Sequence, residues 1–68
     1  MNKEELKELV TIFVDRFGAK PVTKSVFNSW LCGHCHTYPK RANDLIDDMR
    51  FYNLIRLEKG MVEFSNEF

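Results

Sequence analysis

The stretch "PKRANDLIDDMRFYNLIRLEKGMVEF", residues 39–64, joins a helical pattern to a hairpin pattern. Apolar side chains at positions 42, 45, 46, 49 and 52 recur at the spacing of one helical face, which is the strongest period in the chain. Pro39 suits the first turn of that helix, with Thr37 or Tyr38 as its cap. Two short apolar runs then flank "EKG", residues 58–60, where Gly60 can adopt a positive φ. The stretch therefore predicts a helix that runs into a two-stranded β-hairpin.

Upstream, the first helix is predicted over residues 2–17. Asn2 caps it, and its apolar stripe is Leu6, Leu9, Val10, Phe13 and Phe17. Gly18 ends it, and Val22–Thr23 forms a brief extended segment after Pro21.

A second helix follows, capped by Thr23 or Ser25. We expect Gly33 to end this helix and residues 34–39 to connect it to the third one. Its expected buried face is Val26, Phe27, Trp30 and Leu31. One core should then collect Leu9, Phe13, Phe27, Trp30, Leu45, Ile46 and Met49, with Leu57 and Val62 of the hairpin beneath it.

This order of elements resembles the winged helix-turn-helix class over residues 3–65. The resemblance is carried by "PVTKSVFNSWL" as short strand and second helix, by "YPKRANDLIDDMRFYNLI" as third helix running into a strand, and by "RLEKGMVEF" as the wing. The predicted fold class is therefore mainly α with a small β-hairpin, as a single winged-helix domain over residues 1–68.

The resemblance implies that the third helix enters the DNA major groove with its N-terminal residues. Arg41 would pair with guanine and Asn43 with adenine. Phosphate contacts would come from Lys40, from Lys59 at the wing tip, and from Lys20 and Lys24 at the start of the second helix. The implied partner is double-stranded DNA, and the implied role is that of a transcription regulator or accessory factor.

The charge distribution supports this partner, although the net charge is zero. Residues 16–43 hold five Lys and Arg residues and no Asp or Glu, whereas the segments on either side are net acidic.

Three acids, Asp44, Asp47 and Asp48, lie on the predicted third helix and would repel phosphate. The alternative is a winged-helix module that binds another protein, for example in a transcription or replication machine. If Asp44 and Asp47 share a face with Arg41, protein binding gains support.

The cluster "LCGHCHTYP", residues 31–39, admits several interpretations. It matches a haem-attachment pattern and a thiol-redox pattern, but the export signal of the first and the fold of the second are missing. Zinc binding through Cys32, Cys35, His34 and His36 stays a minor alternative, because a structural zinc needs a second pair of ligands. We expect the stretch to be the turn of a helix-turn-helix, with no bound metal.

No catalytic residues, enzyme activity or cofactor are expected from the motifs present. The charged N-terminal segment does not fit a signal peptide, and no apolar run could span a membrane, so the expected location is cytoplasmic. The small size suits a phage or mobile-element origin. The sequence does not define the oligomeric state.

Overall fold

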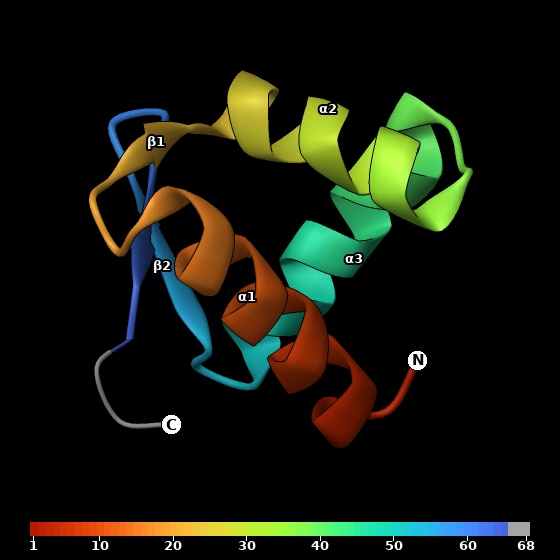
Figure 1. Ribbon diagram of the computed structural model, residues 1–68, viewed down its shortest axis with the longest axis horizontal. Helices are drawn as coiled ribbons and strands as arrows, with labels where there is room; N and C mark the ends of the chain where they lie inside the picture. The colour runs from red at the N-terminus through yellow and green to blue at the C-terminus, as the bar shows by residue number, and fades with distance from the viewer. Residues whose placement is uncertain (66–68) are drawn as a thin grey trace.

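A computed structural model describes residues 1–65 of the chain, so the last three residues of the predicted 1–68 domain lie outside the described part. The elements, in order, are α1 (Lys3–Phe17), β1 (Val22–Thr23), α2 (Lys24–Cys35), α3 (Pro39–Phe51), β2 (Ile55–Glu58) and β3 (Met61–Phe64) (Figure 1). The prediction of a mainly helical fold with a C-terminal hairpin is confirmed.

The three strands form one antiparallel sheet in the order β1-β3-β2. Val62 of β3 lies opposite Val22 on one side and Leu57 on the other, so β3 is the central strand. The hairpin turns through Lys59 and Gly60, whose φ angles are 52° and 78°. Positive φ at both turn residues gives the twist that a two-residue hairpin needs. In the order β1-β3-β2, β2 lies at an edge of the sheet.

The first two helices begin at residues whose side chains cap them. The Asn2 side chain accepts a hydrogen bond from the Glu5 amide at 2.9 Å, while the Glu5 carboxylate accepts one from the Asn2 amide at 3.2 Å. Thr23, rather than Ser25, caps α2 by accepting from the Val26 amide. In α3 the proline at the first position begins the helix without a side-chain cap.

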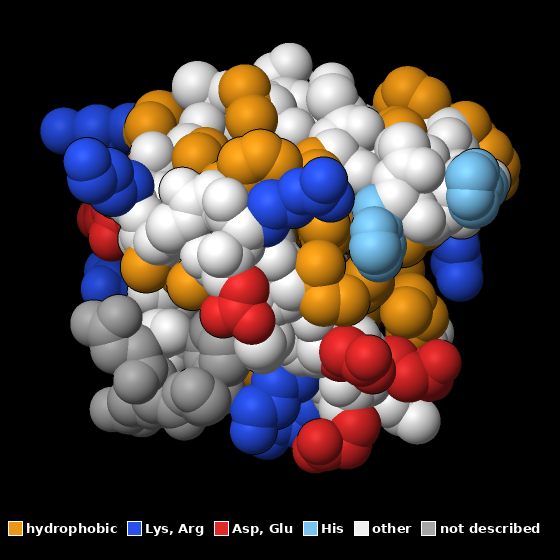
Figure 2. All heavy atoms as spheres, in the orientation of Figure 1, with side chains coloured by type: hydrophobic (Ala, Val, Ile, Leu, Met, Phe, Trp, Pro, Cys, Tyr) orange, Lys and Arg blue, Asp and Glu red, His pale blue; other side chains and the backbone are white. Residues whose placement is uncertain are grey.

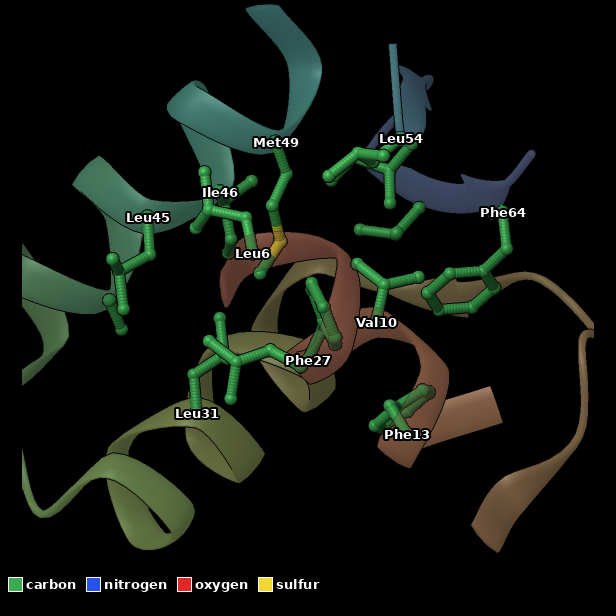
Figure 3. Packing of buried hydrophobic residues seen from close by; sticks show 14 residues of the cluster. Leu6, Val10, Phe13, Phe27, Leu31, Leu45, Ile46, Met49, Leu54 and Phe64 are labelled. Carbon is green, nitrogen blue, oxygen red and sulfur yellow. The ribbon is translucent and has the colours of Figure 1, made fainter. Parts of the chain in front are cut away.

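The core lies between the three helices and the sheet, and side chains from every helix and from β2 and β3 point into it (Figure 3). Trp30 and Leu57, predicted to be in the core, are only partly buried and pack against its margin. The fully or nearly buried set is Leu6, Leu9, Val10, Phe13, Phe27, Leu31, Ala42, Leu45, Ile46, Met49, Leu54, Ile55, Val62 and Phe64.

Two residues predicted on buried faces lie at the surface. Val26 is 54% exposed because it stands about 100° around α2 from Phe27, whose side chain points into the core. Phe17, at the last position of α1, is 56% exposed, although its ring still contacts Phe13 at 4.9 Å between centroids.

The prediction that Gly33 ends the second helix was wrong, because α2 continues to Cys35. The helix ends at His36, which takes the left-handed conformation with φ 51° and donates its amide to the Cys32 carbonyl. A glycine inside a helix costs about 1 kcal/mol relative to alanine, which tertiary packing of α2 can offset. Residues 31–35 are therefore helical, and the connector is limited to residues 36–38.

Within residues 1–65, none of the helices combines the length and apolar character needed to cross a bilayer.

Candidate nucleic-acid interface

An open groove runs between the N-terminal half of α2 and the first turn of α3. A hydrogen bond links the two helices at this groove: the Asn28 side-chain amide donates to the Pro39 carbonyl oxygen at 3.1 Å. The lining residues are Lys24, Ser25, Asn28, Ser29, Pro39, Lys40 and Asn43. The groove thus carries two lysines and several hydrogen-bonding side chains, with no acid in its lining.

The hairpin turn adjoins one end of this groove. The Lys24 amide donates to the Gly60 carbonyl oxygen at 2.9 Å, and Thr23 pairs with Met61 in the sheet. In Figure 1 the turn between β2 and β3 reaches the start of α2 beside β1. Lys59, next to Gly60 in the turn, is exposed, and this main-chain bond brings the turn next to the start of α2.

The structure brings most of the predicted DNA-contacting residues together. Lys24, Lys40 and Asn43 line one groove, and the Lys24–Gly60 bond brings Lys59 near it. Lys20 is exposed on the segment that leads into β1, directly before this corner.

Three polar groove residues were not predicted from the sequence. Ser25, Asn28 and Ser29 occur at i, i+3 and i+4, which places them on one face of α2. This spacing could have been read from the sequence, because polar residues on one face of a helix indicate that this face stays open to solvent.

Arg41 lies apart from the groove. The helical period turns it about 100° from Lys40, but only about 60° from Asp44 and about 20° from Asp48. Arg41, Asp44 and Asp48 are all exposed. Arg41 therefore shares its flank of α3 with acids.

The outward face of α3 becomes acidic and then aromatic along the helix. Lys40, Asp44, Asp47 and Phe51 follow one another at i, i+4, i+7 and i+11, and all four are exposed. Asp47 forms an ion pair with Arg50 at 3.6 Å, and Phe51 is 77% exposed. Asp44 is thus about 60° from Arg41 around α3, whereas Asp47 is about 120° from Arg41 and lies on the stripe of Lys40. Only Asp44 of the two shares the flank of Arg41.

The cysteines and histidines of α2 are spread around the helix. Cys32 and Cys35 are partly buried against the core, and the Cys32 thiol donates to the Asn28 side-chain oxygen at 3.6 Å. Burial and, to a smaller extent, the neighbouring Cys32 raise the pKa of the Cys35 thiol above its ordinary value.

The His34 ring instead stacks on Trp30, with centroids 4.8 Å apart. Figure 2 shows the two histidine side chains separated on the molecular surface. Within residues 1–65, no three potential metal-ligating side chains come together.

Comparisons of the chain with protein-family models, with curated proteins and with solved structures find no match.

Proposed function

We propose that the protein is a winged-helix domain that binds double-stranded DNA, with α2 and α3 as the helix-turn-helix and β2–β3 as the wing. The observation that carries this proposal is the acid-free groove that Lys24 and Lys40 both line, with the turn that holds Lys59 hydrogen-bonded to the Lys24 main chain. These lysines come from three separate parts of the chain, and phosphate attraction is additive over such a cluster. A role as a transcription regulator or accessory factor would follow from this binding.

In the proposed complex only the first turn of α3 approaches the base edges. Asn43 would pair with adenine and Arg41 with guanine, while Lys24 and Lys40 neutralise phosphates. The hairpin turn would follow the backbone beyond the groove. From Asp44 onward the acids of α3 would repel phosphate, which confines the contact to the N-terminal end of the helix.

Two variants distinguish base-specific DNA binding from nonspecific electrostatic attraction to a basic surface. Lys40→Ala should weaken binding to all duplexes alike, whereas Arg41→Ala should lower discrimination at one base position by about 1–3 kcal/mol. Fluorescence anisotropy with a randomised duplex pool, followed by sequencing of the bound fraction, measures both effects. Lys3→Ala, on the acidic first turn of α1, is the matched control and should change neither.

The DNA-binding proposal fails if the protein does not bind duplex DNA at low salt. It also fails if Lys40→Ala and Arg41→Ala behave like Lys3→Ala.

A protein partner is the second candidate, and a specific observation favours it. Asp44 shares the solvent flank of α3 with Arg41, and Asp44, Asp47 and the exposed ring of Phe51 follow one another along the neighbouring stripe of the helix. Acids around an exposed aromatic residue suit a basic protein surface with an apolar pocket. Binding of a host protein that survives nuclease treatment, but is lost in Phe51→Ser, would support this candidate over the first.

A further inference from the structure

One edge of the sheet has unpaired main-chain groups. In a two-residue hairpin the residues that flank the turn exchange hydrogen bonds, and hydrogen-bonded pairs then alternate along the ladder. Glu58 and Arg56 therefore bond to β3, whereas the amide and carbonyl groups of Ile55 and Leu57 point away from it. In the part of the chain that the structure describes, no strand pairs with that side of β2.

Apolar surface lies directly beside this edge. A shallow groove separates β2 from the C-terminal end of α3, and its mixed lining combines Phe51, Ile55 and Leu57 with the polar side chains of Asp47, Arg50, Asn53 and Arg56. Leu57 is only partly buried, and Phe51 is 77% exposed. A strand added to β2 would therefore cover apolar side chains as well as satisfy backbone groups.

The charges on β2 indicate which strand fits. Arg56 and Glu58 project from the solvent face of the sheet, with side chains 74% and 59% exposed. Their guanidinium nitrogen and carboxylate oxygen lie 3.7 Å apart. One positive and one negative residue, two positions apart, form a pattern that complements itself when two copies run antiparallel. In that arrangement the Arg56 of each copy lies opposite the partner's Glu58, so the dimer holds two attractive pairs.

We propose that β2 is the interface of a homodimer, in which two copies pair antiparallel around Leu57 and extend the sheet to six strands. The main-chain groups of Leu57 bond to those of the partner's Leu57, and the two leucine side chains meet on the helix side. A shift that placed Arg56 opposite the partner's Arg56 would bring like charges together, which is destabilising in a cross-strand pair. The short strand and small apolar area indicate a reversible dimer.

This proposal does not rest on DNA binding, because the β2 edge is separate from the groove between α2 and α3. The free edge, the uncovered Phe51 and the self-complementary charges each point to the same face.

A charge-exchange series on the full 68-residue chain tests the proposal. Arg56→Glu and Glu58→Arg each replace two attractive cross-strand pairs with two repulsive ones, so each should raise the dimer dissociation constant by about tenfold or more. The double variant restores both attractive pairs and should dimerise like the original protein. Mixing the two single variants should favour the mixed dimer, because all four charges are then complementary.

Sedimentation velocity over a range of concentrations measures association, and native mass spectrometry of the mixture identifies the mixed dimer. Circular dichroism checks that each variant is folded, and Lys3→Glu, a charge reversal on α1, is the matched control that should leave association unchanged. The proposal is overturned if the original protein stays monomeric up to about 1 mM, a concentration that detects even very weak association. It is also overturned if the double variant fails to recover, or if Lys3→Glu weakens the dimer as strongly as the β2 variants.

Discussion

Phe27→Leu removes the aromatic ring that links three elements of the fold. The Phe27 ring is fully buried and meets Phe13 of α1 edge-on, with centroids 4.9 Å apart and planes at 78°. It meets Phe64 of β3 in the same manner, at 5.6 Å and 82°. The Phe27 ring also stacks on Trp30 within α2, with centroids 6.1 Å apart and planes at 6°. Leucine keeps most of the apolar volume, so the substitution chiefly removes these three ring pairs.

Each such pair contributes about 0.5–1.5 kcal/mol beyond its buried area, so the loss of three pairs should lower the free energy of unfolding by about 1.5–4.5 kcal/mol. A domain of this length has roughly 3–10 kcal/mol in total, so the loss is a large fraction of its stability. The midpoint of urea unfolding, followed by circular dichroism, should decrease while the denaturant slope stays unchanged.

Phe17→Leu is the matched control. The Phe17 ring also contacts Phe13 at 4.9 Å, but it is 56% exposed at the end of α1. We expect a loss below about 0.5 kcal/mol for this surface substitution. Equal losses in Phe17→Leu and Phe27→Leu would refute the argument that the buried ring pairs hold α1, α2 and β3 together.

Three further variants test the helix cap, the hairpin turn and the partly buried Cys35 thiol. Asn2→Ala removes the oxygen that accepts from the Glu5 amide and should destabilise the protein by about 1 kcal/mol in the same urea assay. Lys59→Asn should raise stability by roughly 0.5 kcal/mol, because asparagine tolerates positive φ better than lysine, and yet lower DNA affinity, since a lysine is lost. The raised pKa of Cys35, due to burial and then to Cys32, means that the folded state holds the thiol proton more tightly than the unfolded state. This contribution to stability is complete below the unfolded pKa and is lost as pH rises through the folded pKa. As pH rises above the ordinary thiol pKa of about 8.5, the unfolding free energy should therefore decrease by more in the original protein than in Cys35→Ala.

The local patterns were sufficient to predict the C-terminal half of the fold. The period of Ala42, Leu45, Ile46 and Met49 defines α3, and all four residues are buried. "EKG" predicts the turn because Gly60 adopts positive φ with little steric cost, and the turn lies there. Both signals act over a few residues, which is why sequence alone could reveal them.

Features that depend on packing between distant segments were harder to predict. Gly33 lies within α2 because the contacts of that helix outweigh its low propensity, and His36 provides the left-handed residue that ends it. The pairing of β1 with β3 joins residues about forty positions apart, and the sequence carries no local signal for it. Similarly, Lys24 and Lys40 could be named as candidates at helix starts, but their common groove follows only from how α2 packs on α3.

The salt dependence of duplex DNA binding tests the proposed interface most directly. If Lys24, Lys40, Lys59 and their neighbours neutralise three or four phosphates, the logarithm of affinity should fall against the logarithm of salt concentration with a slope of roughly −3. In Lys40→Ala the slope should become shallower by about one, whereas Lys3→Ala should keep it. A slope near zero, or one that Lys40→Ala leaves unchanged, would contradict DNA binding through the groove between α2 and α3.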